Sequence, residues 1–160
     1  MLNRLFLPFI SPGKPVHIGP CGMNGRAERF AALWLAMLGE RAQNMRCDAR
    51  LVEAAQDHAS FLAEDIYGET RVSMHTGRSD STPNQRVGWT GYKLPDWHGN
   101  GNTVESVALV YDEATVALEM LLSSDAHRPH LLGEGFYEAS TVYGIGQVGG
   151  YWVVLICPPE

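Results

Sequence analysis

The sequence predicts one layered α+β domain, and three observations lead to this prediction. The chain has 160 residues, a length that suits a single hydrophobic core. Amphipathic helical patterns lie in its first half and again near residue 114, a Gly- and Pro-rich stretch lies between them, and apolar β-branched runs lie at its end. Helices early, ordered loops in the middle and strands late are typical of the α+β class.

Three segments place apolar residues at helical spacing, and each therefore predicts a helix with one buried face. Asp48 is expected to cap the second helix and Asp112 the third. Because His58 lies on the apolar stripe of the second helix, we expect it to be buried and to donate to a backbone carbonyl. The stripes are Phe30, Leu33, Trp34, Met37 and Leu38; then Leu51, Ala54, Ala55, His58, Ala59 and Leu62; then Ala114, Ala117, Leu118, Leu121 and Leu122.

Two apolar runs near the C-terminus predict a β-hairpin. They cover residues 142–148 and 151–157, and the pair Gly149-Gly150 between them suits a two-residue turn. Residues 144–149 also fit the GxGxxG pattern of dinucleotide-binding loops. That motif needs a helix after it to hold the pyrophosphate, and here a strand follows, so we do not expect a dinucleotide.

Composition excludes several classes of function. A formal net charge of −6 argues against nucleic acid as a partner, and no apolar run reaches the roughly 18 residues of a transmembrane segment. The first ten residues do not form a convincing signal peptide. Residues 1–25, rich in Pro and Gly, are predicted to be an extended arm on a domain of residues 26–160. Three cysteines, Cys21, Cys47 and Cys157, allow at most one internal disulfide.

A set of short motifs, in order along the chain, resembles a known family. The motifs are LVEAAQDHA at 51–59, MHTG at 74–77, RVGWTGY at 86–92, VESVA at 104–108, SDAHR at 124–128 with the Leu pair at 131–132, and YGIG at 143–146 with the Tyr-Trp pair at 151–152. In this order they resemble the bacterial branch of the CAP superfamily, whose SCP domain is shared by cysteine-rich secretory, antigen five and pathogenesis-related proteins. The resemblance covers about residues 26–157. It implies an α-β-α sandwich with a central antiparallel sheet.

The resemblance also implies a cleft with two histidines and an acid. His75, Glu105 and His127 match the family's site positions, and two imidazoles with one carboxylate are a reasonable ligand set for zinc or another divalent metal. The alternative is that Glu105 bridges the histidines as a polar brace. The segment 93–103 looks longer than usual, and we expect it to roof the cleft with Trp97 and His98 at its rim. The chain departs from the family pattern at Val104, Ser106 and Ala126 and has serines, at 123 and 124, where some members have a second acid.

Two functions of different classes follow from this resemblance. In the first, the cleft binds a small apolar or lipid-like ligand, or a partner chain, without catalysis and with metal as an accessory. In the second, the same cleft is a metal-assisted hydrolase of peptides or esters. The residues alone leave open whether the protein is an enzyme. Because relatives are mostly exported, a secreted or periplasmic location is favoured.

Overall fold

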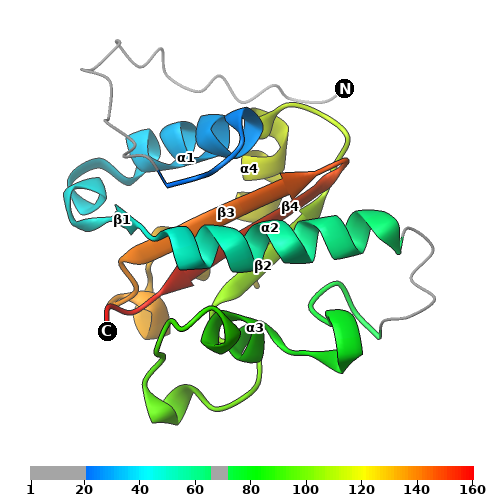
Figure 1. Cartoon of the computed structure of the whole chain (residues 1–160). Helices are drawn as coiled ribbons and strands as arrows, with labels where there is room; N and C mark the ends of the chain where they lie inside the picture. Colours follow the sequence, from blue (N-terminus) through cyan, green and yellow to red (C-terminus); the bar gives the residue numbers. More distant parts are fainter. Residues whose placement is uncertain (1–20, 66–71) are drawn as a thin grey trace.

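A four-stranded sheet lies between two layers of helices in the computed structural model, which describes residues 21–65 and 72–160 (Figure 1). The strand order is β1-β3-β4-β2, with β1 at Arg46–Cys47, β2 at Glu105–Leu109, β3 at Val142–Val148 and β4 at Tyr151–Cys157. The α+β prediction and the predicted hairpin of β3 and β4 are confirmed. The sheet is mixed, however, because the two-residue β1 pairs with β3 in parallel. This strand carries the chain past the sheet edge, from a helix on one face to a helix on the other.

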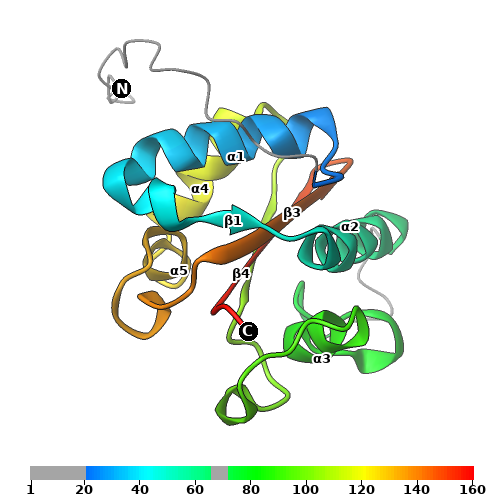
Figure 2. The ribbon, with the colours of Figure 1, turned by 60° about the vertical axis from the view of Figure 1, so that its left-hand side comes forward.

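Helices cover both faces of the sheet, as Figure 2 shows from another side. One layer contains α1 (Gly25–Leu38), α4 (Ala114–Ser123) and α5 (Arg128–Leu132). The other contains α2 (Ala49–Glu64) and α3 (Pro83–Trp89). Short 3₁₀ turns η1 (Gly39–Asn44), η2 (Arg78–Asp80), η3 (Asp96–His98) and η4 (Gly135–Tyr137) lie in the connections.

The strand β4 divides the core between the two layers. Successive side chains of a strand point to opposite faces, so a strand that is buried on both faces is apolar throughout. In β4 the residues Trp152, Val154 and Ile156 pack with α1 and α4. Tyr151, Val153, Leu155 and Cys157 pack with α2 and α3. Both helical layers therefore depend on this one strand.

The helix α1 forms where the periodicity predicts it, and Phe30 and Trp34 are buried as predicted, but the buried face is shifted toward Ala27, Ala31 and Leu35. Asn24 caps it by accepting a hydrogen bond from the Ala27 amide. Met37, predicted to be buried, is 38% exposed, and Leu33 and Leu38 are only half-buried. Both sides of this helix carry apolar side chains, so the packing of α4 and β3 selects the face. The buried residues are Ala27, Phe30, Ala31, Trp34 and Leu35.

The predicted caps have different outcomes. Asp48 caps α2 by accepting from the Arg50 amide, and His58 is buried as predicted. The third predicted helix, α4, begins one residue later than expected, and its N-cap is Glu113 instead of Asp112. The Asp112 carboxylate accepts from the amide of Glu113, so it bonds the cap residue and not the first turn of the helix.

The region 67–103, expected to be mostly ordered loop, contains the helix α3. Its start is a capping box, in which the Thr82 hydroxyl accepts from the Gln85 amide and the Gln85 side chain accepts from the Thr82 amide, with Pro83 as the next residue. The sequence therefore carries a recognisable helix start signal here, which the expectation of a Gly- and Pro-rich loop did not take into account. Residues 66–71 of this region lie outside the described residues.

A disulfide joins Cys21 to Cys47 and ties the start of the described chain to β1. The two cysteines are 26 residues apart, and closing a loop of that length contributes about 3.5 kcal/mol in the chain-entropy model. Cys157 is a buried free thiol. Residues 1–20 of the predicted arm lie outside the described residues, whereas Cys21 and Met23 belong to the core beside α1. No helix in the described ranges is long and apolar enough to cross a membrane.

Candidate functional site

The carboxylate of Glu105, at the start of β2, is the centre of a buried polar cluster. Its Oε2 lies 2.8 Å from Nη2 of Arg86, and its Oε1 lies 3.0 Å from Nδ1 of His75. Burial by itself would raise the pKa of Glu105, but the hydrogen bond from His75 and the charge of Arg86 outweigh it, and the pKa is lowered. Glu105 is therefore a carboxylate at neutral pH, and both of its oxygens are engaged.

Arg86 holds the cluster together from α3. Its Nη1 donates to the carbonyl oxygens of His75 and Ser81, at 3.0 and 2.8 Å, while Nη2 donates to Glu105. The sequence analysis quoted Arg86 inside a motif and gave it no role. The signal that it is buried is its place on one face of α3 with Pro83 and Val87, at the spacing i, i+3, i+4.

His58 comes to the cluster from α2. Its Nε2 lies 2.8 Å from the carbonyl oxygen of Met74 and 3.7 Å from Oε1 of Glu105. Since a carbonyl only accepts, Nε2 carries the proton and Nδ1 is a bare acceptor, which has no hydrogen-bond partner in the described part of the chain. Burial is the main cause that lowers the pKa of His58, so the ring is neutral. The expected core histidine that donates to a backbone carbonyl is thus observed.

His75 and His127 are the more accessible imidazoles. The side chain of His75 is 33% exposed. His127 precedes α5, and its pKa is lowered by burial and then by the charge of nearby His75. Among the described residues no hydrogen bond joins His127 to Glu105, whose partners are His75 and Arg86. The brace in this structure therefore connects His75 to Arg86 and does not connect the two histidines.

The arrangement bears on the predicted metal site. Within residues 21–65 and 72–160, no group of three His, Cys, Asp or Glu side chains is placed to hold a metal ion. A cation on Glu105 would have to replace the Arg86 guanidinium at Oε2 or the His75 imidazole at Oε1. Glu105 therefore does not fit as a metal ligand in this arrangement, whereas the imidazoles of His75 and His127 carry no such ion pair with arginine.

His130, on α5, is a further buried histidine beside the cluster, and the sequence analysis assigned it no role. Its Nδ1 lies 2.7 Å from the Ser106 hydroxyl, and its Nε2 lies 3.4 Å from the carbonyl oxygen of Ile156. Burial lowers the pKa of His130 to about 4. Its neutral ring donates from Nε2 and accepts the hydroxyl proton of Ser106 at Nδ1, so both polar groups are satisfied inside the fold.

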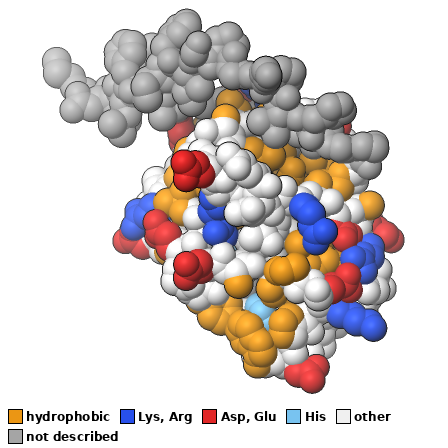
Figure 3. All heavy atoms as spheres, turned by 90° about the vertical axis from the view of Figure 1, so that its left-hand side faces the viewer, with side chains coloured by type: hydrophobic (Ala, Val, Ile, Leu, Met, Phe, Trp, Pro, Cys, Tyr) orange, Lys and Arg blue, Asp and Glu red, His pale blue; other side chains and the backbone are white. Residues whose placement is uncertain are grey.

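Aromatic rings extend from His130 to the surface and form the aromatic strip, which consists of His130, Tyr137, Phe136 and Trp97. Successive ring centroids are 4.9, 5.1 and 5.5 Å apart. Trp97 is 67% exposed and Phe136 53% exposed. On the face shown in Figure 3, hydrophobic side chains gather around a histidine low in the view.

The segment 93–103 supplies one end of this strip. His98, expected at the cleft rim with Trp97, is buried; its ring lies 4.1 Å from that of Trp97, and its Nδ1 bonds the Thr103 hydroxyl. The Asn84 side chain on α3 donates to the carbonyl oxygens of His98 and Gly99. The segment is therefore fixed against α3, and Trp97 is its exposed aromatic residue.

The architecture resembles that of solved SCP-domain structures. An extracellular protein containing an SCP domain from Bacillus anthracis matches with a TM-score of 0.65 at 19% identity over 84% of this chain. An outer surface protein of Borrelia burgdorferi matches with a TM-score of 0.54 at 18% identity over 84%, and a cysteine-rich secretory protein of Staphylococcus aureus with 0.56 at 12% over 82%. The expected fold is confirmed.

The matches differ in how much of the other protein they cover. This chain spans 41% of the Bacillus anthracis chain and 38% of the Staphylococcus aureus chain, but 96% of the Borrelia burgdorferi chain. No protein-family model and no curated protein matches the sequence. At these identities the solved structures establish the fold alone.

Proposed function

We propose that this protein is a non-enzymatic binding module whose cleft takes a small apolar or lipid-like ligand. The observation that carries the proposal is the aromatic strip, because contiguous exposed apolar side chains are the kind of surface that marks binding sites. Its outer rings are exposed, and its inner end, His130, lies within electrostatic range of His127 and Glu105. An amphipathic molecule would place its apolar part on Trp97 and Phe136 and its polar head toward the imidazoles.

Hydrolysis at this cluster is less well supported. A general base works best with a pKa near the working pH, and it must have a free oxygen within reach of the attacking water. The pKa of Glu105 is lowered, and its two oxygens already accept from His75 and Arg86. These contacts favour a structural role for the carboxylate.

Binding is tested with doxyl-labelled stearic acid, followed by electron paramagnetic resonance as the fraction of immobilised label. We expect saturable binding that weakens about tenfold or more in the double variant Trp97→Ala/Phe136→Ala, because two large apolar contacts are lost. Trp89→Ala is the matched control, since Trp89 is 68% exposed and Trp97 67%. Equal losses in the control and the double variant, or no immobilised label with the wild type, would contradict the proposal.

We propose a divalent metal such as zinc only as an accessory, held by His75 and His127 without Glu105. Nδ1 of His75 faces Glu105, so Nε2 is its available atom, and a carboxylate behind a ligating histidine is a common way to orient the ring. His75 and His127 would then hold the ion, which would supply Lewis acidity. We expect calorimetry to show zinc uptake that is lost in His75→Ala/His127→Ala and kept in Trp97→Ala. Uptake that persists in the histidine double variant would place the metal elsewhere.

Export is the proposed location. Disulfides persist in oxidising compartments outside the cytosol, and the described chain contains the Cys21–Cys47 bond. Two of the matching solved structures are described as an extracellular protein and an outer surface protein. Both observations support a secreted or periplasmic protein.

A further inference from the structure

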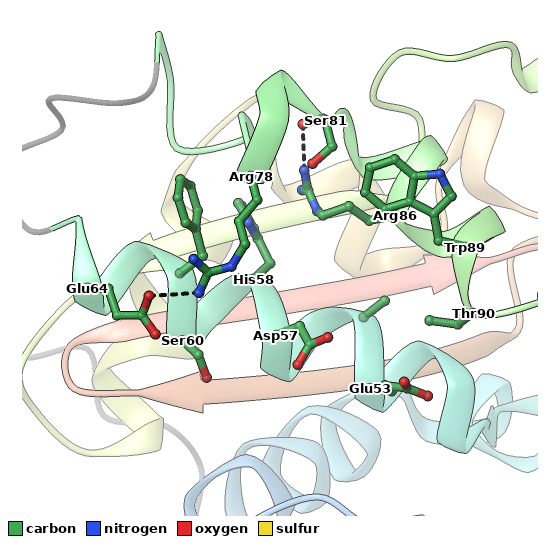
Figure 4. A pocket seen from close by; sticks show the side chains of 12 residues that line it. Glu53, Asp57, His58, Ser60, Glu64, Arg78, Ser81, Arg86, Trp89 and Thr90 are labelled. Carbon is green, nitrogen blue, oxygen red and sulfur yellow. Dashed lines mark hydrogen bonds and ion pairs between the residues drawn. The ribbon is translucent and has the colours of Figure 1, made fainter.

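A surface hollow lies between α2 and α3, and its lining includes no residue of the aromatic strip. It is a groove of about 570 Å³, with α2 as one wall and η2 and α3 as the other (Figure 4). None of the residues that line it is His75, Glu105, His127 or a member of the aromatic strip. The groove shares His58 and Arg86 with the polar cluster, because the Arg86 guanidinium reaches Glu105, but its other lining residues are distinct from that cluster.

The groove carries negative charge that no described residue pairs. Arg78 pairs with Glu64 at 2.7 Å, and Arg86 is neutralised by Glu105, so the two basic side chains of the lining already have partners. The carboxylates of Glu53 and Asp57, one turn apart on α2, form no ion pair with any described residue. Two negative charges thus remain on the α2 wall, and Figure 4 shows both side chains at the groove.

The opposite wall presents an aromatic face. Trp89, at the end of α3, is 68% exposed and lines the groove. An indole ring attracts a cation placed over its face, and tryptophan does so best among the aromatic side chains. Arginine suits such a place because its planar guanidinium stacks on a ring while its N–H groups donate to a carboxylate. The walls are therefore complementary to a guanidinium.

An independent observation comes from two buried polar atoms in the lining. Nδ1 of His58 and Oγ of Ser81 have no hydrogen-bond partner in the described part of the chain, although the side chain of His58 is fully buried and Ser81 is 2% exposed. Buried polar atoms are nearly always paired, and two of the four described side-chain atoms without a partner lie behind the walls of this groove. Because Nδ1 of His58 is a bare acceptor, this side of the groove favours hydrogen-bond donors over acceptors.

We propose that this groove binds an arginine side chain of a partner peptide, with the guanidinium between the carboxylates of Glu53 and Asp57 and the indole of Trp89. Its N–H groups donate to the carboxylates of Glu53 and Asp57, and its plane stacks on Trp89. The proposal goes beyond the lipid-binding function and does not depend on it.

The test uses a fluorescein-labelled Gly-Arg-Gly-Arg-Gly peptide and its citrulline counterpart, which has nearly the same shape without the charge. Fluorescence anisotropy is expected to show saturable binding of the arginine peptide and at least tenfold weaker binding of the citrulline peptide. Glu53→Gln/Asp57→Asn is expected to weaken binding about tenfold and Trp89→Ala about threefold to fivefold. Added salt lowers the affinity, because the pairing is electrostatic.

A matched variant separates a built site from general attraction to an acidic protein. Glu28→Gln/Glu119→Gln removes the same charge from exposed positions on α1 and α4, and binding is expected to change less than twofold. Equal weakening by both double variants, or equal affinity for the citrulline peptide, would overturn the proposal. The proposal would also be overturned if analytical sedimentation showed that the protein dimerises under the assay conditions and that this dimerisation accounts for the anisotropy change. Trp89→Ala is expected to bind doxyl-labelled stearic acid as the wild type does. The peptide and stearic acid assays therefore test the two proposals separately.

Discussion

Arg86→Met is expected to lower the free energy of unfolding by about 3–5 kcal/mol, the usual effect of leaving a buried charge without its partner. Glu105 is 6% exposed and lies 2.8 Å from Arg86, so no solvent replaces the guanidinium. The variant also leaves the carbonyl oxygens of His75 and Ser81 without this donor. Urea denaturation followed by circular dichroism measures the loss.

A double variant isolates the ion pair from the rest of the effect. Arg86→Met/Glu105→Gln is expected to be about 1–3 kcal/mol more stable than Arg86→Met, because the neutral amide no longer needs a counter-charge. If Glu105→Gln lowers the free energy of unfolding of Arg86→Met by as much as it lowers that of the wild type, the two side chains are not coupled.

The same variants have a pH signature. The folded pKa of Glu105 is lowered, so its stabilising contribution is present above its ordinary pKa of 4.5 and is lost as the pH falls through the folded value. In Arg86→Met, burial acts without the opposing charge and the folded pKa rises. The stability difference between wild type and variant is therefore expected to be largest near neutral pH and to narrow toward about pH 4. A constant difference across this range would exclude an ionised Glu105 as the cause.

Gly146→Ala is expected to destabilise the fold by about 3 kcal/mol or more, a shift of the melting temperature of about 10 °C. A Cβ at this position would lie 2.3 Å from the carbonyl carbon of Ala55 and 2.3 Å from the amide nitrogen of Gln56. Both atoms belong to the backbone of α2, which cannot move aside without leaving the sheet. Thermal unfolding by circular dichroism measures the change.

Gly88→Ala is the matched control for this prediction. Gly88 lies inside α3, and an added Cβ there would have no heavy atom within 4 Å. Alanine is the better helix former, so this variant is expected to gain about 0.5–1 kcal/mol. Comparable destabilisation by both substitutions would mean that the close approach of α2 to β3 is not what Gly146 provides.

These glycines also account for the GxGxxG pattern. Gly144 meets the backbone of Leu51 and Val52, and Gly146 meets that of Ala55 and Gln56, so the first two glycines of the pattern let α2 lie directly on β3. The sequence analysis did not expect a dinucleotide-binding loop, because a strand follows the motif, and this packing gives the glycines a different role. The pattern serves contact between helix and sheet.

Local patterns in the sequence determined much of the fold. The hairpin at 142–157, the start of α2 at Asp48 and the burial of His58 follow from periodicity of two or 3.6 residues and from turn and cap chemistry, which act over a few neighbouring residues. Resemblance of the ordered motifs predicted the family's layered fold, and the solved structures confirm it. The helix α3 was also encoded locally, by its capping box.

Only the tertiary structure decided which groups meet. The buried face of α1 depends on α4 and β3, and the partners of Glu105 depend on how α3 lies against β2, which no spacing in the sequence reports. The prediction joined His75, Glu105 and His127, whereas the carboxylate pairs with His75 and Arg86. A buried carboxylate must be paired with strong hydrogen-bond donors that lie close to it in the folded protein. Which donors lie close is decided by tertiary packing, because segments far apart in sequence become neighbours only when the helical layers pack on the sheet.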